Sequence, residues 1–403
     1  MVCIVQLPGR RIWGFSVECC RIVLFIQFVL LETIMKHEQE LFDALRADLA
    51  ELTALHAPPG AEQPVIARLR DLFAPLVDSV SVDHMGNLTA TREGPQGSPH
   101  LVVSAHADEI GAMVASVEPE GFLRLLPLGG VQSRLLEGRA VWVGGHAGVI
   151  GARSGHLTAR SEHGHGTSMT DLYLDLGVDS AAEVEALGVR VGDPVVVISE
   201  LRNLAGTRVS GKGIDNRASC VVLLHLLRRL QHQSLSCRLT ALVTVQEEVG
   251  LRGAQVAFAR LQPNLALVVD TFPAAGTPDT HHLAYTARIG QGALITPSSS
   301  SGDAGFLIPR AARDVMIAAA QRAGVPYQTA VTGSGVTDAA AAHLAGGGVA
   351  TLEVKIPRRY SHSPVELVDL RDVAAVLDLV EELVLHPPLE EQLGFLPAGN
   401  SNV

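Results

Sequence analysis

Apolar runs that suit buried strands alternate with amphipathic helical segments along most of the chain. The strand-like runs lie at 239–245, 265–270 and 348–356, and helical periodicity marks 215–231, 309–324 and 370–385. Long apolar strands that alternate with amphipathic helices indicate a sheet with helices on both faces. We therefore predict an α/β fold in which a mixed sheet is sandwiched by helices.

A stretch of short strands and closely spaced glycines interrupts this alternation. It contains "GFLRLLPLGG" (121–130), "RAVWVGGHAGVIGARSG" (139–155) and "GDPVVVISEL" (192–201). Short strands at such close spacing are typical of a small barrel or sandwich. We predict an inserted small β-barrel domain at 117–207, which divides the α/β domain into 35–116 and 208–390.

The two ends of the chain fit neither pattern. The apolar run at 21–35 follows arginines, as in a signal peptide, but it is too short to span a membrane and no small-residue cleavage site follows it. An amphipathic helix begins at Met35. We predict that residues 1–34 are an extension outside the functional domain, translated from an upstream start codon, with a signal or membrane anchor as the alternative. Residues 391–403 are expected to form a flexible tail.

Charge and cysteine content narrow the class of protein. The chain of 403 residues has a net charge of −11, which argues against nucleic acid as the main partner because phosphate binding needs a basic surface. The five cysteines include no CxxC pair, and Cys220 and Cys237 lie in apolar stretches, where they pack as small hydrophobes. This usage suits a reducing compartment, so we expect a cytoplasmic protein without a membrane partner.

Polar residues that can bind metal follow the ends of the apolar strands. They are two histidines, His106 and His362, and the carboxylates Asp108, Asp215, Glu247, Glu248 and Asp270. Each has an ordinary explanation when taken alone, as a helix cap, a turn former or a solvated edge. Together they would gather at the carboxyl edge of the sheet, where ligands bind in open α/β folds, and buried carboxylates are costly without a cation. Histidines combined with several carboxylates are the ligand set expected of a two-metal hydrolytic site.

The same residues lie in motifs that resemble those of the M42 aminopeptidases, a family of co-catalytic metallopeptidases that includes glutamyl aminopeptidases and the tetrahedral TET enzymes. In the family's order, the motifs are "DHMGNLTA", "AHADEIGAMV", "GKGIDNRAS", "VQEEVGLRGA", "VVD", "GSGVTDAAA" and "IPRRYSHSPVE". The resemblance extends from Met35 to Leu385. It implies a metal-dependent aminopeptidase that removes N-terminal residues from short peptides with a free N-terminus.

The resemblance also implies two divalent metal ions in each subunit, which would be Zn²⁺, Co²⁺ or Mn²⁺. By analogy with the family, one ion would bind His106 and Asp270 and the other would bind Glu248 and His362. Asp215 would bridge the two ions.

The adjacent carboxylates Glu247 and Glu248 can serve different purposes. Neighbouring side chains on an extended segment point to opposite sides, so one can hold a metal ion while the other faces a water molecule. The resemblance places the general base at Glu247, which would take a proton from the attacking water and return it to the leaving amine. It also implies that Asp108 orients the imidazole of His106, as metal-bound histidines usually require.

The inserted domain resembles the dimerisation domain of the family. This implies a homo-oligomer in which dimers assemble into a tetrahedral dodecamer with enclosed active sites. The glycine-rich segment 332–348 is expected to form either a loop near the active site or an ordinary turn between a strand and a helix, and Asp338 would either cap a helix there or touch substrate. The sequence identifies neither the group that binds the substrate amine nor the residues of the specificity pocket.

Three other interpretations compete with an aminopeptidase. A related di-metal deacylase or carboxypeptidase, of the M20 or M28 type, would act on N-acylated amino acids or peptides, but those families lack the inserted segment. A glycosidase needs two carboxylates that face each other about 5–10 Å apart, whereas Glu247 and Glu248 are adjacent and diverge. A binding protein with a degenerate site would lack a ligand or Glu247, and none is missing.

Overall fold

The computed structural model describes residues 17–151, 156, 168–280, 286–301, 304–333, 335–388, 390–394 and 396, without the side chains of 17–31, 34, 390 and 391. The chain divides into two units, one up to Ala47 and one from Asp48 onward. Most of the predicted tail at 391–403 lies outside the described residues. Among the helices that are described, none is long and apolar enough to cross a membrane.

The first helix, α1 (Val17–Ala54), begins well before the predicted start at Met35. No proline or glycine occurs between Val17 and Ala54, so nothing in the backbone chemistry interrupts the helix where the apolar run gives way to the amphipathic segment. Met35 is therefore not a helix boundary. The division between the two units falls further along the same helix, at Ala47. The role of residues 1–34 stays a prediction.

The second unit is built on a nine-stranded mixed sheet. Its strands, in spatial order, are β1 (Ser79–Val82), β2 (Leu88–Arg92), β12 (Arg238–Thr244), β3 (His100–His106), β13 (Leu265–Pro273), β17 (Ala350–Arg358), β14 (Ala293–Ser301) and β15 (Ala304–Leu307), and β16 (Tyr327–Thr332) pairs with β14. The central strands β12, β3, β13 and β17 are parallel, and antiparallel pairs flank them. This confirms the predicted mixed sheet.

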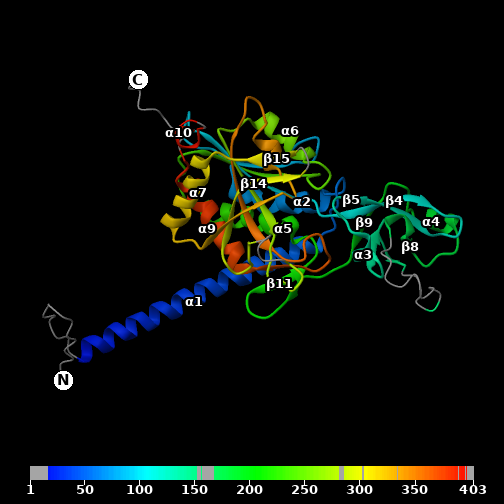
Figure 1. Ribbon diagram of the computed structural model, residues 1–403, viewed down its shortest axis with the longest axis horizontal. Coiled ribbons are helices and arrows are strands. Elements are labelled where there is room, and N and C mark those ends of the chain that lie inside the picture. The colour runs from blue at the N-terminus through cyan, green and yellow to red at the C-terminus, as the bar shows by residue number, and fades with distance from the viewer. Residues whose placement is uncertain are drawn as a thin grey trace. The chain divides into compact units, whose positions relative to one another are not determined.

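Helices cover this sheet, as Figure 1 shows. α5 (Ile214–Leu230) and α7 (Arg310–Ala323) both pack on α9 (Leu370–Leu385), while α6 (Arg252–Leu261) packs on α8 (Ala339–Ala342) and on β12. α5 is apolar around most of its circumference and is buried along nearly its whole length, as such a sequence requires. The remaining short elements are α2 (Gln63–Phe73), η1 (Ala74–Leu76) and α10 (Glu390–Leu393).

The inserted segment forms a closed antiparallel barrel, set apart from the sheet in Figure 1. Its strands are β4 (Gly111–Val117), β5 (Leu123–Leu128), β8 (Tyr173–Asp175), β7 (His146–Ile150), β6 (Ala140–Val143) and β9 (Pro194–Val197), with the short helices α3 (Ser133–Leu136), η3 (Met169–Asp171) and α4 (Ala181–Ala186). The predicted barrel is confirmed. Its predicted first residue, 117, is instead the last residue of β4, because β4 follows β3 after a turn of only a few residues and pairs with β5 and β9.

A small three-stranded sheet pairs the segment that follows the barrel with the segment that precedes α9. It consists of β10 (Arg202–Asn203), β11 (Arg208–Gly211) and β18 (Glu366–Asp369). β11 leads directly into α5, and β18 leads directly into α9. This sheet therefore holds the start of α5 close to the segment that precedes α9.

The register of the parallel strands decides which residues meet at the edge of the large sheet. Thr244 pairs with His106, and Val268 pairs with Ser104. His106 and Asp270 each lie two residues beyond the Ser104–Val268 pair, so they reach the same level at the carboxyl edge. Asp270 in turn pairs with Lys355 of β17.

Replacing Leu174 with alanine tests whether the barrel has a core of its own. Leu174 is fully buried among barrel side chains, so its truncation is expected to lower the free energy of unfolding by about 2–5 kcal/mol. The matched control is Leu126→Ala on β5, where the side chain is 54% exposed and the expected loss is below about 0.5 kcal/mol. Urea denaturation of both variants measures this, and equal losses would contradict a packed barrel core.

Candidate active site

The two adjacent glutamates lie in the turn that ends β12. Gln246 has a φ of 55°, in the left-handed region that non-glycine residues rarely adopt, and Gly250 has a φ of 119°. These two positions turn the chain sharply away from the strand. Glu247 and Glu248 lie between them and remain at the carboxyl edge of the sheet.

Five residues predicted as metal ligands come together at this edge. His106 Nε2 lies 3.3 Å from Asp215 Oδ1 and 3.8 Å from Asp270 Oδ1. On the other side of Asp215, His362 Nε2 lies 3.3 Å from Asp215 Oδ2 and 3.5 Å from Glu248 Oε1. Asp215 thus stands between the two imidazoles, with one oxygen toward each.

Glu247 and Glu248 diverge as their adjacency predicts. Glu247 Oε2 lies 3.9 Å from His106 Nε2, whereas Glu248 faces His362. Glu247 is only 8% exposed and has no ion pair beyond that with His106 among the described residues. The two carboxylates therefore serve opposite halves of the cluster.

Asp108 has more contacts than the sequence predicts. The backbone carbonyl oxygen of Asp108 lies 3.1 Å from His106 Nδ1, and its carboxylate Oδ1 lies 3.5 Å from the same nitrogen. Its two carboxylate oxygens accept the backbone N–H groups of Glu247 and Glu248, each at 3.0 Å. Asp108 therefore positions the glutamate pair as well as the imidazole.

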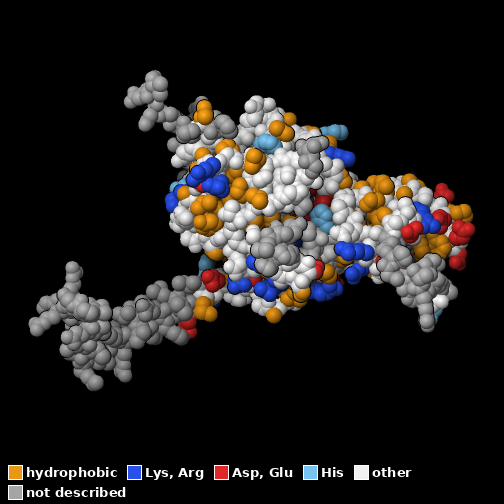
Figure 2. All heavy atoms as spheres, viewed as in Figure 1, with side chains coloured by type: hydrophobic (Ala, Val, Ile, Leu, Met, Phe, Trp, Pro, Cys, Tyr) orange, Lys and Arg blue, Asp and Glu red, His pale blue; other side chains and the backbone are white. Residues whose placement is uncertain are grey.

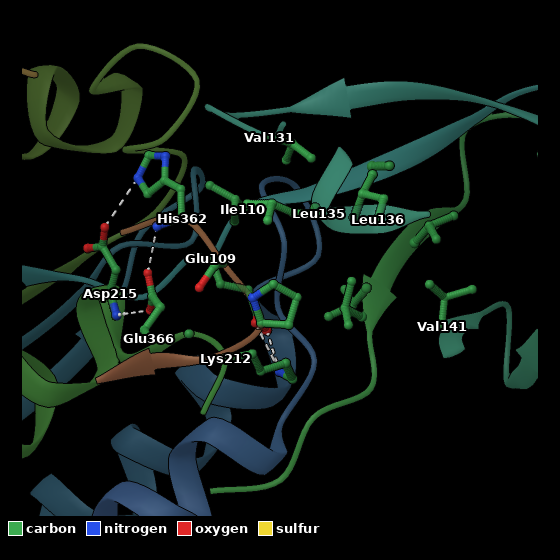
Figure 3. A pocket seen from close by; sticks show the side chains of 18 of the residues that line it. Glu109, Ile110, Val131, Leu135, Leu136, Val141, Lys212, Asp215, His362 and Glu366 are labelled. Atoms are coloured by element: carbon green, nitrogen blue, oxygen red, sulfur yellow. Dashed lines mark hydrogen bonds and ion pairs between the residues drawn. The ribbon is translucent and has the colours of Figure 1, made fainter. Parts of the chain in front are cut away.

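Glu366, which the sequence did not single out, positions the backbone in the other half of the site. Its carboxylate accepts the backbone N–H groups of Asp215 and His362, each at 2.9 Å, as the dashed lines in Figure 3 show. It also forms an ion pair with Arg358. Its place four residues after His362 was visible in the motif, but only the folded chain shows that its carboxylate points inward.

Arg358 brings a permanent positive charge to the cluster. Its Nη2 lies 2.8 Å from Asp215 Oδ2 and donates to Ser361 Oγ at 2.8 Å. Burial opposes ionisation of Asp215, but the charge of Arg358 and the imidazoles of His106 and His362 outweigh it and hold the pKa of this carboxyl well below its usual range. Asp215 is therefore a carboxylate at neutral pH.

The other carboxyls of the cluster are less easily ionised. Burial raises the pKa of Glu248 to about 8 and that of Asp270 to about 7, and nearby carboxylates add to both shifts. Burial likewise holds the pKa of Glu247 well above its usual range, with Asp270 and Glu248 contributing. Such a group of acids is stable in the charged form only beside cations.

The donor set fits divalent metal ions. Two groups, His106 with Asp215 and Glu248, and His106 with Glu247 and Asp270, place one ligand atom per residue within 4.8 Å of each other. The oxygen Asp215 Oδ1 is buried and accepts no hydrogen bond of good geometry from the described residues. Imidazole with carboxylate oxygens is the donor chemistry that Zn²⁺, Co²⁺ and Mn²⁺ accept.

Two cavities meet at these residues, where acidic and histidine side chains reach the surface beside the barrel (Figure 2). A polar cavity is lined by His106, Glu247 and Asp270. An apolar cavity extends toward the barrel, where Figure 3 shows the aliphatic side chains that line it. Both cavities share Asp215, Glu248 and His362.

Asp338 lies behind the site rather than in it. It occupies the N-cap position of α8, but its carboxylate makes no capping bond and instead accepts a hydrogen bond from Thr244. It is 2% exposed, and burial raises its pKa to about 6. It is not among the residues that line either cavity at the site. The capping bond predicted as one of its two roles is also absent.

Known proteins share this architecture. The family model for the M42 glutamyl aminopeptidases matches residues 86–379. A glutamyl aminopeptidase from Lactococcus lactis subsp. cremoris is 31% identical over 341 residues, which are 83% of this chain and 92% of that protein. The structure of an aminopeptidase from the archaeon Desulfurococcus kamchatkensis matches with a TM-score of 0.82 at 32% identity, over 91% of this chain and 99% of that one. A TET1 peptidase from Pyrococcus horikoshii, described as assembling into a tetrahedron or a large octahedral shell, matches with a TM-score of 0.74 at 30% identity, over 85% and 99%.

Fold, site and relatives together define a hydrolase of the metallopeptidase class. More specifically, the chain belongs to the M42 family of peptidases, whose members include aminopeptidases. This confirms the predicted family, enzyme class and fold. It does not favour the deacylase or carboxypeptidase alternative. Membership of a metallopeptidase family implies divalent metal ions, and the clustered side chains provide suitable ligands.

Substitutions of Asp108 and Glu366 test the four backbone hydrogen bonds that these two carboxylates accept. In Asp108→Asn and Glu366→Gln, one carboxylate oxygen becomes an NH₂ group that cannot accept a backbone N–H. We expect each variant to bind Zn²⁺ or Co²⁺ about 10- to 100-fold more weakly, the usual cost of losing a group that orients ligands. Isothermal titration of chelator-treated protein measures this. Glu93→Gln, whose side chain is 58% exposed, is the control, and wild-type affinity in both test variants would contradict the positioning role.

Proposed function

We propose that the protein is an aminopeptidase that uses two divalent metal ions to remove N-terminal residues from short peptides. The observation that carries the proposal is the placement of Asp215 between His106 and His362, with a different carboxylate beside each imidazole. A single metal ion would need only one imidazole with its neighbouring carboxylates, whereas the site has two such sets on either side of Asp215. The family membership supports the reaction class.

The proposed ligand sets follow from the two halves. His106 and Asp270 would hold one ion, Glu248 and His362 would hold the other, and Asp215 would bridge them. When bound, the ions would supply electrophilic stabilisation of the scissile carbonyl and lower the pKa of the attacking water. Their charge would also offset that of the buried carboxylates, whose ionisation burial opposes.

Glu247 is proposed as the general base and acid. Its carboxylate lies beside the His106 half and lines the polar cavity. It would accept a proton from the attacking water at a carboxylate oxygen and then deliver that proton to the leaving amine nitrogen. Asp108 holds the backbone of Glu247 in place and so acts as a positioning residue rather than a proton carrier.

The substrate and assembly are proposed from the relatives. The Lactococcus protein is a glutamyl aminopeptidase, and the Pyrococcus TET1 peptidase assembles into closed shells. We propose that this chain also acts on free N-termini and forms a homo-oligomer through its barrel, with a tetrahedral dodecamer as the finer prediction. A cytoplasmic location likewise stays a prediction. Cys220 and Cys237 are free and buried.

The metal requirement is tested with a panel of amino-acid p-nitroanilides. Activity should disappear when the purified protein is stripped with chelator, because the ligands no longer hold the ions, and return with Zn²⁺, Co²⁺ or Mn²⁺. Substrates with an acetylated amine should remain uncut. Release of acetate from the acetylated substrates, with the free-amine substrates left uncut, would support the deacylase interpretation instead.

Glu247→Gln and Glu248→Gln form a matched pair of neighbours with opposite expected effects. Glu247→Gln should keep both metal ions and lose at least about 1,000-fold in kcat, since it removes the proton carrier. Glu248→Gln should bind only one ion tightly, because it removes a ligand. Metal content by plasma mass spectrometry, with kcat, decides the roles, and loss of metal in Glu247→Gln alone shows that they are reversed.

A further inference from the structure

We propose that Lys355 selects substrates with an acidic N-terminal residue, glutamate or aspartate, by pairing with the side-chain carboxylate in the polar cavity. This rests on the aminopeptidase function proposed above and adds the substrate class. Lys355 belongs neither to the M42 motifs nor to the proposed ligand set, and it lies in the strand-like run at 348–356.

The strand register places Lys355 beside the metal site. Lys355 on β17 pairs with Asp270 on the parallel strand β13, so the two side chains leave the sheet on the same face. Lys355 lines the polar cavity together with His106, Glu247 and Asp270. A side chain on the substrate's first residue would therefore lie within reach of the lysine while its carbonyl is at the site.

Lys355 has unused donor capacity. Its Nζ lies 3.1 Å from Glu353 Oε2, and Glu353 is the one carboxylate within ion-pair distance of it among the described residues. Glu353 accepts a further hydrogen bond from Thr337. An ammonium group has three N–H donors, so a single carboxylate partner leaves donors for a ligand.

The geometry favours an acidic over a basic side chain. Glu353 precedes Lys355 by two residues on the same strand and is fully buried, and it is not among the cavity-lining residues. The cavity therefore meets the ammonium group of Lys355 and not the carboxylate of Glu353. The four carboxylates that line the cavity, those of Asp215, Glu247, Glu248 and Asp270, are occupied as the proposed metal ligands and general base. A carboxylate would gain a charge-assisted hydrogen bond there, whereas a lysine or arginine side chain would meet a like charge.

The surrounding wall suits a short side chain with a charged end. The ring centroid of Phe272 lies 5.6 Å from Lys355 Nζ, which holds the ammonium by a cation–π contact. Phe272, Pro273 and Val336 supply apolar contacts for methylene groups, and Thr271 and Thr337 supply hydroxyls. This combination resembles a ligand pocket with apolar walls and one charged group that sets specificity.

A purely structural role for Lys355 makes a different prediction. As a counter-ion for the neighbouring Asp270, whose pKa it lowers against the effect of burial, Lys355 would influence every substrate alike. As a specificity residue, it would influence acidic substrates alone. The ratio of rates on two isosteric substrates separates the two roles.

The experiment compares kcat/KM for glutamyl-, glutaminyl-, leucyl- and lysyl-p-nitroanilide. Wild type should prefer the glutamyl over the glutaminyl substrate by about 10- to 100-fold, the usual value of a hydrogen bond to a charged group. Lys355→Met should remove that ratio whatever its effect on the leucyl rate, because the ratio compares two isosteric substrates, and Lys355→Glu should move the preference to the lysyl substrate. Lys36→Met, whose side chain is 80% exposed, is the matched control.

Equal kcat/KM values for the glutamyl and glutaminyl substrates in the wild-type protein overturn the proposal. This test needs no variant, so it still applies if Lys355→Met does not fold. A uniform loss on all four substrates in folded Lys355→Met overturns it in favour of the structural role. Binding of L-glutamate against L-glutamine, measured by titration of metal-loaded protein, gives a readout that needs no turnover. If no p-nitroanilide is cut, the proposed function fails, and the glutamate-to-glutamine affinity ratio still decides the role of Lys355.

Discussion

Four carboxylates, those of Asp215, Glu247, Glu248 and Asp270, are buried together at one edge of the sheet, and the surrounding structure has to hold their charge there. Burial favours the neutral form of three of them. Asp215 stays ionised because Arg358 and two imidazoles surround it. A buried charge is tolerated only when it is paired and hydrogen-bonded, so the arginine, the histidines and the expected metal ions belong to one electrostatic unit.

Two further carboxylates, those of Asp108 and Glu366, accept backbone N–H groups of the residues in that unit. Asp108 accepts the N–H groups of Glu247 and Glu248, and Glu366 accepts those of Asp215 and His362. Each joins segments that are more than a hundred residues apart in the chain. Negative charges at these two places fix the backbone of the proposed ligands and of Glu247, and the carboxylate of Asp108 also lies beside the imidazole of His106.

The sequence predicted the elements and ligands whose signals are local. Strand and helix periodicity anticipated β12, β13, α5 and α9, and the motifs anticipated the histidines and carboxylates that the fold brings together. What could not be predicted depends on contacts between distant segments. Glu366 resembles any surface glutamate until β18 pairs with β11, and the barrel takes in β4 only because β4 pairs with β5 and β9. The predicted helix start at Met35 is wrong because the composition changes there while the helix continues.

The same register that assembles the site also determines what lies next to it. Asp270 and Lys355 are neighbours across β13 and β17, so one strand contributes a proposed ligand and the adjacent strand contributes a cation to the same cavity. A substitution at 355 leaves the residues that hold Asp270 on β13 unchanged, because parallel strands are joined through backbone hydrogen bonds and not through these side chains. With Lys355 in its proposed role, substrate choice on this scaffold would vary through one strand while the proposed metal ligand on the next is kept.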